Sequence, residues 1–309
     1  MNETAVASTV LMIRPARFAA NAETAGSNRF QRQMAEARDI ASAALAEFDT
    51  AVDALILAGV RVEIIDDTLE PWKPDAVFPN NWVSFHANGT VCLYPMLAPT
   101  RRLERRPDVL SILERERGYR INQIDDLSTA EQNGRYLEGT GSLVLDRAHR
   151  IAYACLSART DEQLVHEWCE RYGYEPLVFH AVDAAGAAIY HTNVVMCMGD
   201  RFAVVCLDAI ADPVERESVS SRLNGTGHRI VPISIEQMGR FAGNMLLLKN
   251  RDGERILLMS SRAEQSLVKQ QRDSLLEFAR IVSSPLNTIE DCAGGSMRCM
   301  IAELFLPRR

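Results

Sequence analysis

The sequence lacks the features that place a chain in a membrane or on a nucleic acid. Its longest apolar runs, such as residues 54–60, are far shorter than the roughly 20 residues of a membrane-spanning helix. The formal net charge is -7 at pH 7, and residues 101–106 form the only basic cluster. This charge disfavours nucleic-acid and membrane partners. No Lys or Arg precedes the first apolar run, so we expect no secretory signal and a cytoplasmic location.

The seven cysteines show no disulfide or zinc pattern. Their number is odd and no C-x-x-C pair occurs, so neither a complete disulfide framework nor a zinc cluster is indicated. Four of them lie in apolar, strand-like runs, where cysteine is a small buried hydrophobe: Cys92, Cys155, Cys197 and Cys206. The nearest match to a dinucleotide loop, residues 138–142, lacks a third glycine. The sequence therefore predicts no metal ion and no cofactor.

The chain does have length and regularity. It has 309 residues, of which 47% are hydrophobic and 24% charged, enough for a large core. One sequence pattern occurs five times, at residues 59–66, 118–125, 173–180, 227–234 and 283–290. In each copy a small residue ends a predicted helix and an apolar strand follows. A near-constant period indicates a repeated structural unit. We therefore predict a single domain over residues 1–309, although length alone would suggest two.

The segments between the copies predict two strands and a helix in each unit. Helices are expected at residues 108–116, 160–172, 213–223 and 261–281. A longer helix would follow Asn28 as its N-cap, with Phe30 and Met34 on its apolar face. Strands such as 142–145 and 151–156 are joined by hairpin turn residues. Each unit therefore reads strand, strand, helix, strand, and five units closed around an axis leave no exposed sheet seam.

A polar or nucleophilic residue follows each copy, where the first strand of the next unit should begin. These residues are Asn81, Glu138, His191, Asn244 and Cys299. If the five units close around an axis, all five side chains meet at its centre. That would assemble a cysteine, a histidine and a carboxylate from three distant segments, as a cysteine-dependent catalytic site requires.

Four segments resemble those of the pentein, or guanidino-group-modifying, superfamily. They are residues 74–82 (PDAVFPNNW), 137–141 (LEGTG), 190–193 (YHTN) and 294–299 (GGSMRC). In order and spacing they are similar to the substrate-binding, carboxylate, histidine and nucleophile segments of arginine deiminases and dimethylarginine dimethylaminohydrolases. The chain resembles most closely the citrulline-utilisation hydrolase branch. The resemblance implies a five-bladed, pseudo-fivefold α/β propeller of ββαβ units that acts as a cofactor-free hydrolase.

The resemblance implies three catalytic roles. Cys299 is the nucleophile, because a thiolate is suited to attack a carbon bonded to several nitrogens. His191 protonates the leaving amine and then activates water. Glu138 orients His191 and supports its protonated form. We expect protonated His191 and nearby N–H groups to stabilise the Cys299 thiolate before the substrate binds.

The resemblance also implies a substrate site for an amino acid. Asp75 would bind the α-amino group, and Arg101 and Arg159 would grip the α-carboxylate with paired hydrogen bonds. Arg102 could serve in place of Arg101, which could instead be a solvated surface residue. The other predicted substrate-binding residues are Phe78, Asn80, Asn81, Asn193 and Asn244.

The chain departs from the arginine-type pattern at three positions. Asn80, Asn81 and Asn193 stand where arginine-type enzymes place acidic residues. A carboxylate suits a cationic guanidinium, whereas an amide both donates and accepts and therefore suits a neutral ureido group. We therefore expect citrulline as substrate, with ornithine, carbon dioxide and ammonia as products.

Several alternatives remain open at this stage. The chain could be a deiminating hydrolase of arginine or methylarginine, or an amidinotransferase in which a second amine replaces water. A third alternative is a non-enzymatic, ribosome-associated binding protein of the same superfamily, which the intact Cys, His and Glu set disfavours. The sequence does not decide the oligomeric state, and a homodimer is one possibility.

Overall fold

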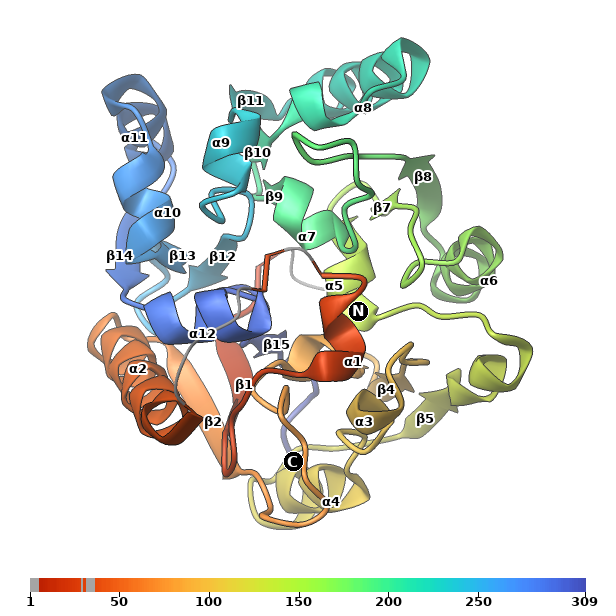
Figure 1. Cartoon of the computed structure of the whole chain (residues 1–309), viewed down its shortest axis with the longest axis vertical. Helices are drawn as coiled ribbons and strands as arrows, with labels where there is room; N and C mark the ends of the chain where they lie inside the picture. The colour runs from red at the N-terminus through yellow and green to blue at the C-terminus, as the bar shows by residue number, and fades with distance from the viewer. Residues whose placement is uncertain (1–5, 29, 32–36) are drawn as a thin grey trace.

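A computed structural model describes residues 6–28, 30–31 and 37–309 of the chain. In this part of the chain, fifteen strands form five separate three-stranded sheets, arranged around a common centre (Figure 1). Helices lie on the outside of the sheets, and two helices, α1 (Ala22–Ala25) and α12 (Asn287–Ala293), lie in front of the centre in Figure 1. No helix in the described residues is long and apolar enough to span a membrane.

All five sheets share one pairing pattern. The first strand pairs antiparallel with the second, which lies in the middle and pairs parallel with the third. Four of the sheets are β3 (Val83–Phe85), β4 (Thr90–Leu93) and β5 (Gln123–Asp126); β6 (Leu143–Asp146), β7 (Ile151–Cys155) and β8 (Glu175–Phe179); β9 (Met196–Met198), β10 (Phe202–Val205) and β11 (Arg229–Pro232); and β12 (Leu246–Lys249), β13 (Arg255–Ser260) and β14 (Arg280–Ser284).

The fifth sheet joins the two ends of the chain. Strand β15 (Ala302–Glu303) pairs with β1 (Thr9–Arg14), which pairs in turn with β2 (Arg61–Asp66). The predicted ββαβ unit and mixed α/β class are therefore confirmed, and the five sheets are consistent with a pseudo-fivefold repeat. The sheets remain separate in their strand pairing, so the pairing does not show a closed propeller.

The outer helices connect the second and third strands of each unit. They are α2 (Ala37–Leu57), α4 (Pro107–Arg115), α6 (Glu162–Tyr172), α8 (Pro213–Gly225), and α10 (Ser261–Ser266) with α11 (Lys269–Leu276). Helices α6 and α8 start at aspartate N-caps, because Asp161 and Asp212 each accept a hydrogen bond from a backbone N–H of the first turn. Gly173 ends α6 in the left-handed conformation. Shorter helices are α3 (Pro99–Arg102), α9 (Ile235–Met238), η2 (Ser128–Asn133) and η3 (Leu207–Ala209).

A short helical turn precedes the first strand of three units. These turns are η1 (Pro79–Asn81), α5 (Gly139–Ser142) and α7 (Thr192–Val195). Asn81 ends η1, whereas Glu138 and His191 are the residues just before α5 and α7. These polar residues were predicted at strand starts, but it is the turns that hold them. Strand β9 accordingly starts only at Met196, after the α7 turn.

The fifth copy of the repeat was placed wrongly. The pattern predicted a strand within residues 283–290, but β14 covers Arg280–Ser284 and is followed by helix α12. The predicted helix 261–281 correspondingly ends at Leu276. Ala279 is the small residue that precedes the strand, and Arg280 pairs with Ile256 of the neighbouring strand. The prediction assigned the position of the small residue at the helix end to Ser283, whereas Ala279 occupies it.

Most of the helix predicted to follow Asn28 is confirmed. The described part of α2 covers Ala37–Leu57, Met34 lies outside the described residues, and Phe30 and Gln31 are not helical. The Asn28 side chain accepts a hydrogen bond from the Phe30 backbone N–H and donates one to the Ala293 carbonyl, so it joins this segment to α12. The Phe30 ring packs on Tyr190. The described residues Asn28 and Phe30 therefore contact the centre of the molecule.

Candidate active site

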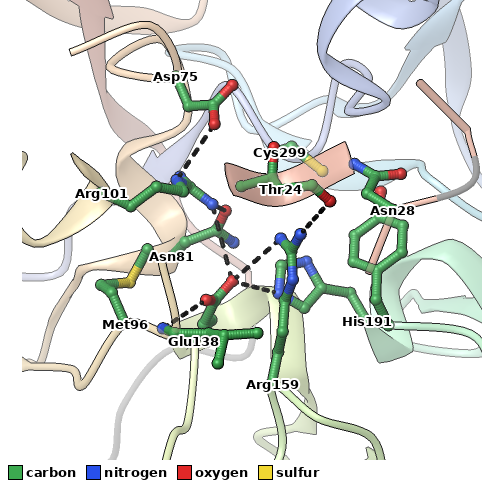
Figure 2. Close-up of polar contacts among 12 residues, drawn as sticks. Thr24, Asn28, Asp75, Asn81, Met96, Arg101, Glu138, Arg159, His191 and Cys299 are labelled. Atoms are coloured by element: carbon green, nitrogen blue, oxygen red, sulfur yellow. Dashed lines mark hydrogen bonds and ion pairs between the residues drawn. The ribbon is translucent and has the colours of Figure 1, made fainter. Parts of the chain in front are cut away.

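A small pocket gathers residues from several units at the inner ends of the sheets. Seven residues predicted from the sequence line it: Asp75, Phe78, Asn81, Arg101, Arg159, His191 and Cys299. Three more contact this lining from behind, namely Glu138, Asn193 and Asn244. The structure thus places the predicted cysteine, histidine and carboxylate in one buried polar cluster (Figure 2).

Amide groups surround the Cys299 sulfur. The Nδ2 atom of Asn244 lies 3.3 Å from Sγ, and that of Asn193 lies 3.5 Å away. The orientation of Asn244 is fixed, because its Nδ2 also donates to the Asn193 carbonyl at 2.9 Å and its Oδ1 accepts from the Arg298 backbone N–H at 3.0 Å. Its N–H group therefore faces the sulfur and donates a hydrogen bond to it.

Glu138 is an anion paired with His191. The two side chains are buried, and Nε2 of His191 lies 2.8 Å from Oε2 of Glu138. Burial by itself raises the pKa of Glu138, but the Arg159 charge, the His191 hydrogen bond and the Arg101 charge together hold it well below its usual range. An ionised carboxylate only accepts hydrogen bonds, so the proton of this pair lies on Nε2. The other ring nitrogen, Nδ1, is then free to take up a proton.

His191 is neutral at neutral pH. Burial lowers its pKa to about 4; Glu138 opposes this effect, and the charges of Arg159 and Arg101 add to it. The expectation of a protonated His191 beside the Cys299 thiolate is therefore wrong for the free protein, because burial and two arginines outweigh Glu138. His191 is poised instead as a base that can accept the Cys299 proton.

Arg101 is a buried residue of the site. Only 2% of its surface is exposed, which excludes the alternative of a solvated arginine. Its Nε and Nη2 atoms form a paired contact with Glu104, both at 2.9 Å, and Nη1 donates to Oδ1 of Asn81 at 2.9 Å. Arg102 instead donates to backbone carbonyls. Arg101 is therefore the arginine at the pocket, but Glu104 already occupies the fork that was predicted to hold a carboxylate.

Arg159 connects the catalytic carboxylate to the segment before α2. Its Nη1 atom lies 3.5 Å from Oε2 of Glu138, and Nη2 donates to Oγ of Ser27 at 2.7 Å and to the Thr24 carbonyl at 3.3 Å. The guanidinium also lies 4.9 Å from the centre of the Tyr190 ring. In Figure 2, Arg101 and Arg159 approach Glu138 from two sides.

Asp75 offers a free acceptor to the pocket. Its Oδ2 atom accepts from Nδ2 of Asn21 at 2.8 Å, whereas Oδ1 is buried and has no hydrogen-bond partner among the described residues. Burial raises the pKa of Asp75, and the Arg101 charge and the Asn21 hydrogen bond oppose this effect. An ammonium group in the pocket would satisfy Oδ1.

Asn80 does not lie on the pocket. It is fully buried outside the pocket lining, and its side-chain atoms have no hydrogen-bond partner among the described residues. The η1 turn brings Asn81 to the pocket lining, whereas a role of Asn80 in binding stays a prediction. At Gly141, an added Cβ atom would lie 2.4 Å from Nδ2 of Asn81 and 2.8 Å from His191, so the site requires glycine at this position.

Sequence reasoning missed five residues near the pocket. Asn21, Thr24, Ser27 and Asn28 come from the segment before α2, where Thr24 and Asn28 line the pocket. Asn28 was interpreted as a helix N-cap, and Asn21, Thr24 and Ser27 have no sequence signal beyond their polarity. Glu104 was hidden in the basic cluster, although its spacing of three residues from Arg101 on a helical turn could have suggested the pair.

The fold and the Cys, His and Glu cluster define a cysteine-dependent hydrolase of the pentein superfamily. A family model described as N,N dimethylarginine dimethylhydrolase, eukaryotic, matches residues 14–306. The chain therefore belongs to this family of hydrolases, which confirms the predicted enzyme class and acts against the non-enzymatic alternative. The match does not single out the citrulline-hydrolysing branch. No curated protein sequence matches the chain at a significant level.

Solved structures with the same fold include relatives of known activity. The unliganded structure of ArgZ, an arginine dihydrolase from the ornithine-ammonia cycle in cyanobacteria, aligns with a TM-score of 0.74 at 18% identity, over 97% of this chain and 41% of that one. Its N-terminal domain, in a substrate-bound variant, aligns with a TM-score of 0.72 at 17% identity over 96% of this chain and 99% of the domain. The chain thus spans about two fifths of full-length ArgZ.

A dimethylarginine dimethylaminohydrolase is also similar. A variant of that enzyme, as an adduct with S-methyl-L-thiocitrulline, aligns with a TM-score of 0.64 at 13% identity, over 96% of this chain and 99% of that one. At these identities the alignments establish the fold. The substrate has to be argued from the side chains of this chain.

Proposed function

We propose that the protein hydrolyses the ureido group of citrulline to ornithine, carbon dioxide and ammonia. One observation carries the proposal: the side chains that hydrogen-bond to Cys299 Sγ are the amides of Asn193 and Asn244. An amide can donate to the ureido oxygen and accept from its N–H groups, whereas a guanidinium offers only donors and a positive charge. The reacting end of the pocket is therefore matched to a neutral group.

The acidic residues near the pocket support this choice. Glu104 is paired with Arg101, and Glu138 is paired with Arg159 and His191. The negative charges of these two carboxylates are therefore already compensated and do not attract a cationic substrate. An unpaired buried charge is costly, and a neutral ureido group avoids that cost.

The first half of the reaction forms a covalent intermediate. Neutral His191 accepts the Cys299 proton, and the thiolate attacks the ureido carbon. The bond from this carbon to the substrate side-chain nitrogen breaks, and His191 returns the proton to the leaving amine, which departs as ornithine. The carbon remains on the sulfur as a carbamoyl thioester. Glu138 stabilises the imidazolium that forms between these proton transfers.

Water completes the reaction. His191 takes a proton from a water molecule, which attacks the thioester carbon and releases the Cys299 thiolate. The carbamate that leaves decomposes to carbon dioxide and ammonia. One water is consumed for each citrulline, and no oxidant, reductant or cofactor is required.

The charged end of the pocket suits the α-amino acid part of the substrate. The unpartnered Oδ1 atom of Asp75 would accept hydrogen bonds from the α-ammonium group. Arg159, which contacts Ser27 and the Thr24 carbonyl in this structure, would turn one N–H pair to the α-carboxylate. Arg101 would act mainly through its charge, because Glu104 holds its fork.

Arginine or a methylarginine is the second candidate substrate. The family described as dimethylarginine dimethylhydrolase and the likeness to an arginine dihydrolase favour it. An amidinotransferase reaction would require an amine to replace water in the second half. These reactions differ in their products, so they can be separated by one assay.

The test is to incubate the purified protein with citrulline, arginine and dimethylarginine in separate reactions. We expect citrulline to yield ornithine and ammonia in equal amounts, with a kcat/KM well above that for arginine. Adding a primary amine acceptor should leave the products unchanged. A higher kcat/KM for arginine, or no ornithine from citrulline, would reject the citrulline proposal and favour the second candidate.

A further inference from the structure

A second group of metal-ligating side chains lies outside the active site. Asp146 ends β6, His149 lies in the turn between β6 and β7, and His228 precedes β11. One ligand atom from each lies within 4.8 Å of the other two. We propose that Asp146, His149 and His228 form a binding site for a divalent transition-metal ion of the zinc type. The sequence predicted no metal site, because His228 lies far from Asp146 and His149 along the chain.

The geometry is close to that of a zinc site. Nδ1 of His149 lies 2.9 Å from Oδ2 of Asp146, and Nδ1 of His228 lies 3.8 Å from the same oxygen. Ligand atoms about 2.0–2.1 Å from a tetrahedral ion lie roughly 3.3 Å apart, between these two values. Two imidazoles and a carboxylate are ligands that zinc prefers, and a water would complete the fourth position.

The surrounding structure holds the ligands in place. Oδ1 of Asp146 accepts from the His149 backbone N–H at 3.1 Å, which leaves Oδ2 for the two histidines. The Thr226 hydroxyl lies 2.9 Å from Nδ1 of His228. The same hydroxyl also lies within hydrogen-bond distance of two backbone carbonyls, so it can donate its proton to a carbonyl and leave Nδ1 for the ion.

Access and charge also favour a cation. Asp146 and His228 are buried, whereas 43% of the His149 side chain is exposed, so an ion can enter from solvent. The charge of Asp200 acts on His228 in addition to that of Asp146. Elsewhere, His180 pairs with Glu215 at 2.9 Å in an ordinary histidine–carboxylate contact that has no second histidine. That pair is a matched control.

The ion would join two units of the fold. Asp146 and His149 belong to the β6–β7 hairpin, and His228 belongs to the turn that enters β11 of the next unit. Asp146 lies at the end of β6 away from Glu138, and a four-residue strand spans about 13 Å. We therefore assign the ion a role in stability and not in hydrolysis.

The experiment is a zinc titration of the full chain carrying Cys299→Ser, which removes the active-site thiol as a competing ligand. We expect one equivalent of zinc to bind and to raise the Tm. Cobalt(II) should give the intense visible bands of a tetrahedral site. His149→Ala in the same background should weaken binding at least about tenfold, the loss expected even for residues that only support a ligand. His180→Ala should bind zinc as before.

His149 is exposed, so its substitution should not prevent folding, and the Tm without metal checks this. Asp146→Asn is a second variant that keeps the side-chain shape and should also weaken binding. The proposal is overturned if Cys299→Ser binds no zinc, or if His149→Ala and His180→Ala bind it equally well. Neither outcome bears on the substrate of the active site.

Discussion

The two ends of the substrate pocket are built from different chemistry. Around Cys299 the contacts are amides, with Asn193 and Asn244 directed at the sulfur. At the other end, Arg101 and Arg159 alternate with Asp75, Glu104 and Glu138 in a buried network of ion pairs. The amide end is neutral and can contact a ureido group. The charged end can bind the ammonium and carboxylate groups of a free amino acid.

This difference assigns separate tasks to the two ends. Changes at the amide end, and at Glu138 because it contacts His191, should alter the reaction or the choice of reacting group, whereas changes at the other charged residues should mainly alter affinity. His191 links the two ends. Glu138 and the two arginines at the charged end set its pKa, and its ring acts on the reacting group. Substitutions at each end test whether this separation is real.

Removing the nucleophile should have the largest effect. Cys299→Ala removes the atom that forms the covalent intermediate, so we expect citrulline turnover to fall by at least about 10⁴-fold. The charged end remains intact, so calorimetry should still detect citrulline binding with an affinity within a few-fold of wild type.

Buried cysteines elsewhere are the control for this variant. Cys155→Ala and Cys206→Ala should lower the free energy of unfolding by about 1 kcal/mol, as for small buried side chains, without a selective loss of activity. Near-normal turnover in Cys299→Ala would contradict the mechanism, and a catalytic defect in a control would indicate a different nucleophile.

The second largest effect should follow from the carboxylate that links the two ends. Glu138→Gln removes the charge that stabilises protonated His191, and we expect kcat to fall by about 10²- to 10⁴-fold, the range of an acid–base contribution. His191 acts from its neutral form, so wild-type kcat/KM should stay level below pH 6.5 and fall only as the pH passes through about 4. Glu138 raises the pKa of His191, so the acid limb should lie at still lower pH in Glu138→Gln.

Initial rates measured from pH 3.5 to 8 would show the acid limb, with circular dichroism to confirm that the protein stays folded. A wild-type acid limb near pH 6.5 would mean that the pKa of His191 is not lowered, and a rate that falls as the pH rises through neutrality would mean that protonated His191 is the active form, as the sequence had suggested. A limb that does not move in Glu138→Gln would mean that another group titrates.

The units and most of the centre could be predicted from the sequence because they depend on local patterns. Alternating apolar runs and small helix-ending residues define a ββαβ repeat, and Asn81, Glu138, His191, Asn244 and Cys299 follow that repeat. The fifth copy failed because Ala279 and Ser283 are both small, and only pairing with β13 decides which residue precedes the strand.

The remaining features depend on contacts between distant segments. The pKa of His191 follows from burial and from arginines on two other loops, so no local pattern could reveal it. The segment containing Thr24 and Ser27 reaches Arg159 across more than 130 residues of sequence. Asn80 and Asn81 are adjacent and chemically identical, and only the geometry of η1 separates them.

A smaller effect is expected when a charge is kept but its planar shape is lost. Arg159→Lys retains one positive charge near Glu138, but a point charge does not reproduce paired hydrogen bonds to a carboxylate. We expect KM for citrulline to rise by about tenfold or more and kcat to change less. An analogue of citrulline without the α-carboxylate should be a poor substrate for wild type and should lose little further in the variant. An unchanged KM would place the carboxylate elsewhere.

The smallest expected effect concerns Asn81, an amide of the pocket that contacts Arg101 at the charged end. Asn81→Asp places an anion beside Arg101 at the pocket, where Oδ1 of Asn81 already accepts from Nη1 at 2.9 Å. The added charge attracts a guanidinium and gains nothing from a ureido group, so the ratio of kcat/KM for arginine to that for citrulline should rise by about tenfold, which corresponds to about 1.4 kcal/mol. Turnover of both substrates should fall, because a nearby anion disfavours the thiolate.

Asn80→Asp is the matched control, because Asn80 lies outside the pocket lining and should leave the ratio unchanged. Equal changes of this ratio in the two variants would show that the charge acts through the fold. A wild-type ratio that already favours arginine would contradict the assignment of the amide end as selective for a neutral group.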